Sequence, residues 1–169
     1  MADPVALDIL LPATRFIARG DGAAIAAMEF SFGVDFPREA CRAATKGQRA
    51  ALWLGPDEWL LLAPDGEADV VVRSLTEALR GEPASIVDVS DRQLGIGVSG
   101  PKSAVTLNAF NALDLHTDAF PVGMCTRTLF GKAEIVLWRT AADVFHIEVW
   151  RSFAPYVLGC LAEAAREYA

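Results

Sequence analysis

Residues 53–62 read WLGPDEWLLL: two apolar runs, each with a tryptophan, on either side of Gly-Pro-Asp-Glu. Gly55 and Pro56 favour a reversal of the chain, so the two runs predict a β-hairpin. Its arms, residues 50–54 and 59–63, are almost continuously apolar, which is typical of strands covered on both faces. Nothing in the stretch is a nucleophile or a base. We therefore expect the hairpin to be framework, with its turn facing outward.

On either side of this hairpin, the hydrophobic periodicity predicts strands separated by helices. Alternation within residues 23–34 predicts a strand, whereas residues 1–22 read as an irregular segment packed against the domain or against a partner. The pattern after the hairpin predicts, in order, a helix at 67–79, strands at 84–89 and 93–99, a short helix at 101–110, a hairpin at 124–139, a strand at 145–150 and a helix capped by Ser152.

Runs of antiparallel-looking strands interrupted by helices indicate an α+β fold, in which mostly antiparallel sheets pack against helices. The 169 residues fit a single domain spanning 1–169. Two related halves fit within that length, although the sequence shows no clean repeat.

The composition argues against a membrane protein. Hydrophobic residues make up 53% of the chain, but no apolar run approaches the roughly 20 residues of a membrane-spanning helix. Asp3, Pro4 and Asp8 lie where a secretory signal would carry basic residues and a long apolar stretch. The three cysteines form no CxxC pair, which disfavours a disulfide framework or a zinc knuckle and suits a reducing compartment. We therefore expect a cytoplasmic protein.

The charge pattern argues against nucleic acid as a partner. The net charge is −7, from 22 acidic and 15 basic residues, and Lys and Arg occur singly along the chain. A surface that follows phosphates needs grouped cations. A protein partner or a small ligand fits this chain better.

The sequence GIGVSG at 95–100 has the glycine spacing of a dinucleotide-binding loop. In such a loop the strand runs into the first glycine. Here Gly95 and Gly97 alternate with Ile96 and Val98 inside the predicted strand itself. We therefore interpret the two glycines as a strand face that another backbone approaches closely.

Catalytic candidates are few. His116 lies between Asp114 and Asp118, a setting that suits metal ligation or an oriented base but also an ordinary solvated loop. His146 falls on the polar face of a strand. No serine lies in a GxSxG elbow. The census predicts no catalytic, cofactor-binding or metal-ligating residue in this chain.

Aromatic and turn residues fit contacts with a protein partner better. Trp150 is predicted to share a strand face with His146 and Glu148, and tryptophan on a polar face is typical of interface anchors. The acidic hairpin turn could pair with an arginine of a partner, or it could simply be solvated. The candidate interface residues are Trp53, Asp57, Glu58, Trp59, Gly95, Gly97, His146 and Trp150.

Three stretches resemble the gamma-subunit family of heterotetrameric, bacterial-type sarcosine oxidases. They are WLGPDEWLLL, then VDVSDRQLGIGVSGPKSAVTLNAF, then PVGMCTRTLFGKAEIVLWRTAADVFHIEVWRSFAPYVLGCLA, and together they cover most of the chain from about Ala50 onward. More broadly, the chain from Asp88 resembles the folate-binding aminomethyltransferase family, through a D-x-S strand signature and the strands and helices that follow it.

The resemblance implies an α+β fold like that of an aminomethyltransferase domain. It also implies a complex that oxidatively demethylates sarcosine to glycine, formaldehyde and hydrogen peroxide. FAD, FMN, NAD, tetrahydrofolate and zinc are then expected on the alpha, beta and delta partner subunits, and the gamma chain is a non-catalytic assembly subunit. A stand-alone folate-binding or one-carbon-transfer accessory protein is the alternative, and an independent enzyme using His116 is a third interpretation.

Overall fold

The computed structural model describes residues 3–168, which form two compact units. Unit 2 comprises residues 12–90. Unit 1 comprises the chain up to Leu11 together with the chain from Asp91 onward. The chain therefore starts in unit 1, builds the whole of unit 2, and then returns to finish unit 1.

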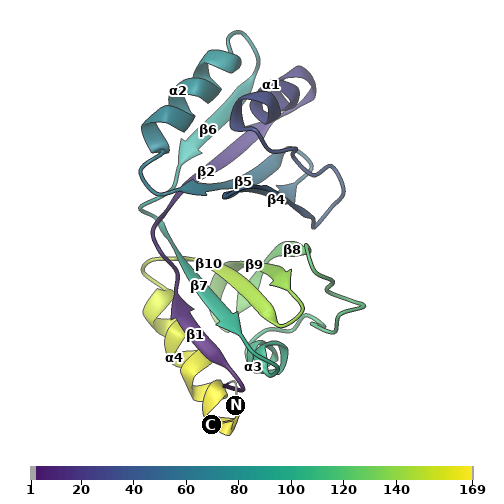
Figure 1. The fold of residues 1–169 in the computed structure, drawn as a ribbon, viewed down its shortest axis with the longest axis vertical. Coiled ribbons are helices and arrows are strands. Elements are labelled where there is room, and N and C mark those ends of the chain that lie inside the picture. Colours follow the sequence, from purple (N-terminus) through teal and green to yellow (C-terminus); the bar gives the residue numbers. More distant parts are fainter. Residues whose placement is uncertain (1–2, 169) are drawn as a thin grey trace. The chain divides into compact units, whose positions relative to one another are not determined.

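Unit 2 is a five-stranded antiparallel sheet, strand order β3-β4-β5-β2-β6, with helices α1 and α2 on one face (Figure 1). Between helices and sheet lies a core that includes the fully buried Phe16, Met28, Trp59 and Leu75. The elements are β2 (Ala13–Gly20), α1 (Gly22–Phe32), β3 (Ala43–Lys46), β4 (Arg49–Gly55), β5 (Glu58–Pro64), α2 (Ala68–Ala78) and β6 (Ala84–Asp88).

Unit 1 is also a five-stranded antiparallel sheet, with strand order β1-β7-β10-β9-β8. Its core includes the fully buried Ile96, Phe145, Ile147 and Leu161. The elements are β1 (Ala6–Ile9), β7 (Gln93–Ser99), α3 (Ser103–Asn108), β8 (Cys125–Phe130), β9 (Ala133–Ala141), β10 (Val144–Trp150), α4 (Ala154–Ala165) and a short 3₁₀ helix (Arg166–Tyr168).

The two units share one topology. Along the chain, each has a strand, a helix, three strands and a second helix, and the sheet orders correspond strand for strand. Without the edge strands β3 and β8, this is the split βαβ arrangement of ferredoxin-like folds. In unit 2 the strand after the second helix is β6, whereas in unit 1 its place is taken by β1, from the other end of the chain. The expected related halves are therefore present as a repeated topology.

Strand β1 is held to β7 by an antiparallel ladder that runs from the pair Ala6 and Ser99 to the pair Ile9 and Ile96. The ladder continues beyond the strand, because the Leu10 N–H donates to the carbonyl oxygen of Gly95 at 2.9 Å. The prediction of an irregular N-terminal segment is therefore wrong. Its prolines lie outside β1 and β2, where they do not interrupt either ladder.

The predicted strand within residues 23–34 is also wrong, since this segment forms helix α1 and ends at Gly33. The alternation of Met28, Phe30 and Phe32 suggested a strand. However, the segment is alanine-rich, which favours a helix, and apolar side chains surround the helix on all sides, so no helical period stands out. Gly33 has a φ of 79° and its N–H donates to the carbonyl of Glu29, a common helix C-terminus.

The other predicted elements are confirmed, with small shifts of their ends. The arms of the WLGPDEWLLL hairpin are β4 and β5, and residues 59–63 of β5 are buried without interruption, as expected for a strand covered on both faces. Helix α4 begins at Ala154 after an N-cap at Phe153, which makes no side-chain capping bond, so the predicted cap at Ser152 is wrong.

Within residues 3–168, no helix has the length and apolar character needed to span a membrane.

Arg139 organises the long connection between α3 and β8. It is 3% exposed, and its guanidinium donates to the carbonyl oxygens of Leu115 at 3.0 Å and Phe120 at 2.8 Å. It also donates to the carbonyl of Ala142 at 2.6 and 3.0 Å, and it stacks on the Phe145 ring at 4.8 Å. Buried carbonyls need partners, so this arginine satisfies groups that the loop cannot satisfy itself.

We expect Gly100→Ala to destabilise the protein more than Gly47→Ala. Both glycines have positive φ, 109° and 62°, so an alanine is strained at either position. A Cβ at Gly100 would also lie 2.6 Å from the Pro4 carbonyl oxygen, whereas no atom lies within 4 Å of one at Gly47. Chemical denaturation should show a loss of about 1 kcal/mol for Gly47→Ala and about 2–4 kcal/mol for Gly100→Ala. Equal losses would contradict the close approach of the N-terminal segment.

We expect Arg139→Met to lower the free energy of unfolding by about 2–4 kcal/mol, because it leaves buried carbonyls without donors. Arg139→Lys should recover only part of this loss, since one ammonium cannot reproduce the planar set of donors. The exposed Arg80 provides the matched control, and Arg80→Met should change stability by less than about 0.5 kcal/mol. Limited proteolysis should cut the 113–120 loop earlier in Arg139→Met; unchanged cleavage and stability would show that the loop is held by other contacts.

Candidate functional site

The two tryptophans of the WLGPDEWLLL hairpin differ in environment. Trp53 and Trp59 pair across β4 and β5. Trp59 is fully buried: its indole N–H donates to the carbonyl oxygen of Pro37 at 2.9 Å, and its ring centroid lies 5.4 Å from that of Phe36. Its side chain therefore belongs to the core of unit 2. Trp53 is partly buried and packs against the edge of the same core.

The hairpin turn carries two carboxylates beside an arginine of the same unit. Arg19 lies 3.8 Å from Asp57 and 3.7 Å from Glu58, and the Asp57 carbonyl accepts a hydrogen bond from the Gly20 N–H at 3.1 Å. The side chains of Arg19 and Asp57 are 54% and 57% exposed, where an ion pair contributes at most about 1 kcal/mol. The turn thus faces outward, as predicted, and its carboxylates already have a cationic neighbour.

The glycines of β7 make room for this chain's own N-terminal segment. Gly97 pairs with Asp8 of β1 on one side and with His146 of β10 on the other. A Cβ on Gly97 would lie 3.1 Å from the Leu10 side chain. The group closest to Gly97 is therefore a side chain of this chain's own N-terminal segment, whereas the sequence predicted another backbone.

The GIGVSG motif does not form a phosphate-binding loop. Its first glycine lies within β7, two residues after the strand begins, and the helix that follows, α3, has only six residues. At the start of that helix, the Lys102 N–H donates to the Pro4 carbonyl oxygen at 3.0 Å. The position where a phosphate would need a free backbone donor is thus taken by the N-terminal segment.

His116 takes part in a local turn. Its backbone N–H donates to a carboxylate oxygen of Asp114 at 2.9 Å, and its Nδ1 accepts the Asp118 N–H at 3.3 Å. The His116 side chain is 68% exposed. Within residues 3–168, no group of three or more His, Cys, Asp or Glu side chains is placed to hold a metal ion. Both flanking aspartates therefore contact His116, Asp114 at its backbone N–H and Asp118 also through a carboxylate oxygen 3.5 Å from Nδ1.

His146 and Glu148 form a close pair on β10. The His146 Nε2 lies 2.7 Å from a carboxylate oxygen of Glu148, and the imidazole lies over the Trp138 ring at 5.7 Å. The sequence placed His146 on the polar face of a strand, at the surface or in an interface; the Glu148 side chain is 1% exposed and that of His146 is 19% exposed. His146 therefore has two partners within unit 1, the Glu148 carboxylate and the Trp138 ring.

Trp150, in contrast, is displayed at the surface. It is 44% exposed, and the guanidinium carbon of Arg92 lies 5.1 Å from its ring centroid. Sequence reasoning identified Trp150 but missed Arg92, because the two residues become neighbours only through the pairing of β7 with β10. Arg151, which follows Trp150 directly, was a signal available in the sequence.

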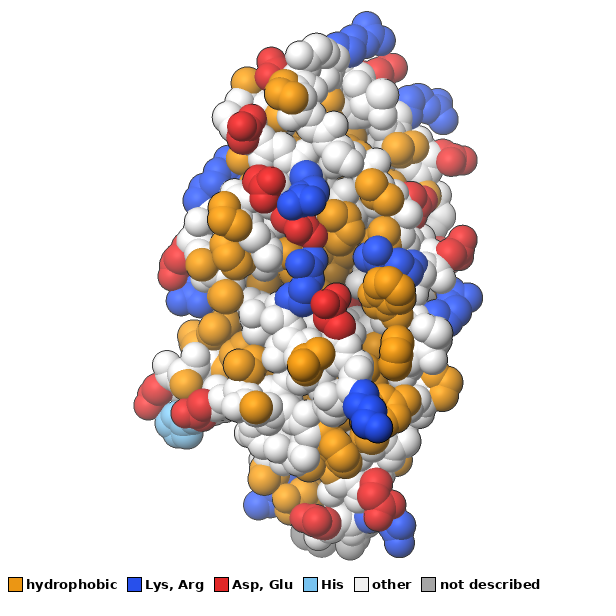
Figure 2. Space-filling view, turned by 180° about the vertical axis from the view of Figure 1, so that it is seen from behind, with side chains coloured by type: hydrophobic (Ala, Val, Ile, Leu, Met, Phe, Trp, Pro, Cys, Tyr) orange, Lys and Arg blue, Asp and Glu red, His pale blue; other side chains and the backbone are white. Residues whose placement is uncertain are grey.

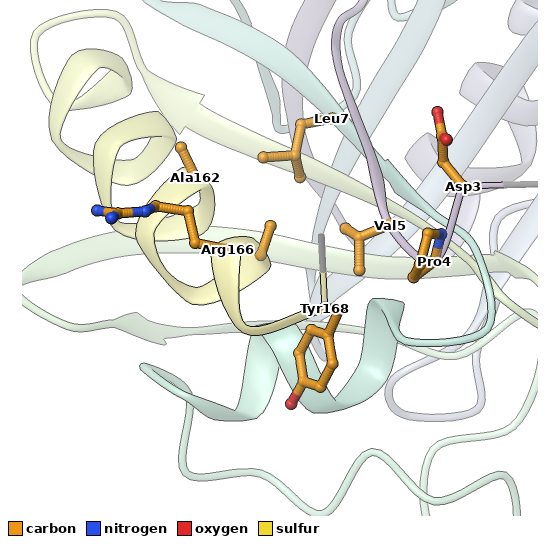
Figure 3. Close-up of a pocket in the computed structure, with 8 residues that line it drawn as sticks. Asp3, Pro4, Val5, Leu7, Ala162, Arg166 and Tyr168 are labelled. Atoms are coloured by element: carbon orange, nitrogen blue, oxygen red, sulfur yellow. The ribbon is translucent and has the colours of Figure 1, made fainter.

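Unit 1 also has an open pocket between β1 and the end of α4 (Figure 3). It has a volume of about 340 Å³ and a mainly apolar lining that includes Val5, Leu7 and Ala162, with Asp3 and Arg166 as its charged residues. Arg166 is paired with Glu163 at 2.8 Å. The remaining described residues of the lining are Pro4, Ala165 and Tyr168, so the pocket offers a mainly apolar contact surface.

Charged side chains are dispersed on the surface. Figure 2 shows Lys and Arg side chains interspersed with Asp and Glu, with hydrophobic side chains between them. On the face shown, the described residues form no continuous basic track of the kind that nucleic-acid binding uses.

The family model described as "Sarcosine oxidase, gamma subunit family" matches residues 18–167. A sarcosine oxidase subunit gamma from Arthrobacter sp. is 31% identical over 145 residues, which are 85% of this chain and 70% of the relative. A second, from Corynebacterium sp. (strain P-1), is 34% identical over 120 residues, which are 71% of this chain and 58% of the relative. The match extends further toward the N-terminus than the motifs after Ala50 implied.

The solved structures agree. A chain of the heterotetrameric sarcosine oxidase from Corynebacterium sp. U-96 superposes with a TM-score of 0.92 at 28% identity, covering 99% of this chain and 87% of that one. Glycine cleavage system aminomethyltransferase T from Bartonella henselae matches with a TM-score of 0.72 at 12% identity, over 94% of this chain and 45% of that one, which shows a shared fold. The predicted α+β, aminomethyltransferase-like fold is thus confirmed. This chain belongs to the sarcosine oxidase gamma subunit family.

Proposed function

We propose that this chain is a non-catalytic assembly subunit of a heterotetrameric sarcosine oxidase, an enzyme that oxidatively demethylates sarcosine to glycine, formaldehyde and hydrogen peroxide. The observation that carries the proposal is the extent of the similarity, since the superposition with a heterotetrameric sarcosine oxidase covers 99% of the chain. Because the match covers both units, it favours a role shared with that sarcosine oxidase chain over similarity of fold alone.

The environments of the polar candidates support a structural role. Arg139 donates to loop carbonyls, and His116 is part of a local turn. Trp59 lies in the core. At the N-terminus of α3, the Lys102 N–H donates to the Pro4 carbonyl oxygen. These side chains and donors serve the fold, which leaves surface contact as the function that the chain supports best.

In this proposal the partners are the alpha, beta and delta subunits, and the complex works in the cytoplasm. FAD, FMN, NAD, tetrahydrofolate and zinc belong to those partners.

A folate-binding accessory protein is the second candidate. The fold shared with aminomethyltransferase T favours it, and so does a 33% identity over 118 residues with an aminomethyltransferase from Saccharopolyspora erythraea. That match spans only 32% of the relative, which leaves most of an aminomethyltransferase without a counterpart in this chain.

We expect co-expression with the three partner subunits to give one co-eluting complex that oxidises sarcosine, because a subunit that works by contact acts only when bound. Size-exclusion chromatography and a peroxide-release assay measure assembly and activity. The matched control omits this chain alone, and complex formation should then fall sharply.

The purified chain alone should be colourless and inert toward sarcosine. Turnover by the isolated chain would contradict a non-catalytic role, and full assembly and activity without it would contradict a role in assembly. Saturable quenching of its tryptophan fluorescence by tetrahydrofolate would favour the accessory protein instead.

A further inference from the structure

Two arginines and two exposed aromatic side chains gather where β7 begins and β10 ends. Arg92 precedes β7 directly, and its guanidinium carbon lies 5.1 Å from the centroid of the Trp150 ring at the end of β10. The Arg151 N–H donates to the Arg92 carbonyl at 2.8 Å, and the Phe153 N–H donates to the Trp150 carbonyl at 2.8 Å. We call Arg92, Trp150, Arg151 and Phe153 the Arg-Trp patch.

The patch is displayed on a rigid support. Trp150 pairs in register with Gln93, so the backbone under the aromatic ring belongs to the sheet, and α4 starts directly after Phe153. Trp150 and Phe153 are nevertheless 44% and 43% exposed, and both arginines are exposed. Trp150 and Phe153 are three residues apart and joined by a backbone hydrogen bond, and Trp and Arg are enriched among the residues that dominate interface energies.

The two arginines of the patch carry positive charge beside one exposed carboxylate, Asp91, which directly precedes Arg92. Within residues 3–168, neither Arg92 nor Arg151 forms an ion pair with a carboxylate. Helix α4 begins here without an acidic residue in its first turn and without a side-chain cap, so its positive end adds to the local potential. In a chain with a net charge of −7, this arrangement selects a partner surface that bears carboxylates.

From this geometry we infer that the Arg-Trp patch is the place where unit 1 contacts an acidic surface of another subunit of the oxidase. The inference rests on the proposed assembly function and adds the docking surface to it. Trp150 and Phe153 supply the apolar centre of the contact, and the two arginines pair with carboxylates of the partner at its edge.

The test measures binding of this chain to each of its separately purified partner subunits, by biolayer interferometry. The double variant Arg92→Glu/Arg151→Glu should bind at least about tenfold more weakly, and Trp150→Ala should have an effect of similar size. The matched control, Arg73→Glu/Arg80→Glu, makes the same change in net charge at exposed positions of unit 2 and should bind like the wild type. Unfolding curves check that each variant is folded.

Rising salt should weaken the wild-type interaction more than that of the double charge variant, because the lost contacts are ionic.

If the wild-type chain binds and the charge variant binds equally well, the docking inference is wrong while the assembly function stands. If the control loses as much affinity as the charge variant, the effect is one of net charge and the inference is also wrong. Self-association of the free chain that Trp150→Ala abolishes would assign the patch to a second copy and overturn it too. Failure of the wild-type chain to bind at all would instead reject the assembly function.

Discussion

Backbone hydrogen bonding between β1 and β7 is the constraint on which unit 1 depends. Without β1, the unit would have the first five elements of the repeated topology and its second helix, but the edge of β7 opposite β10 would be left unpaired. Unit 2 closes the equivalent edge with β6, which follows its own second helix. Unit 1 instead takes its last strand from the beginning of the chain, so the chain must leave unit 1, build unit 2 and return.

The pairing of β1 with β7 also explains the glycines of the GIGVSG motif at residues 95–100. Gly97 and Gly100 lie where β1 and the residues before it come closest, and a Cβ at either position would meet Leu10 or the Pro4 carbonyl. A glycine pattern that resembles a nucleotide loop thus serves the closure of a sheet. Arg139 and Trp59 also serve the fold, because each donates to a backbone carbonyl oxygen. Within residues 3–168, the Arg-Trp patch combines exposed aromatic rings with two arginines that form no ion pair with a carboxylate, which fits the proposed role in binding.

Much of the fold could be predicted from local patterns, and the exceptions have physical causes. Strict alternation marked β7 and β10, and an apolar helical stripe marked α4. Helix α1 was missed because its exposed side is as apolar as its buried side, so its hydrophobicity has no period. The pairing of β1 with β7 joins residues at opposite ends of the sequence, which local patterns do not report. For the same reason Trp150 was recognisable as a surface aromatic, but its contact with Arg92 was not.

Hydrogen exchange tests the dependence of unit 1 on β1 most directly. Amide protection in β7 and β5 should be compared between the full chain and a chain that begins at Pro12. Loss of β1 leaves the β7 edge open to solvent and to fraying, so the account predicts that protection in β7 falls by at least about tenfold while protection in β5 of unit 2 is kept. Equal protection of β7 in the two chains would contradict the claim that the N-terminal strand completes this sheet.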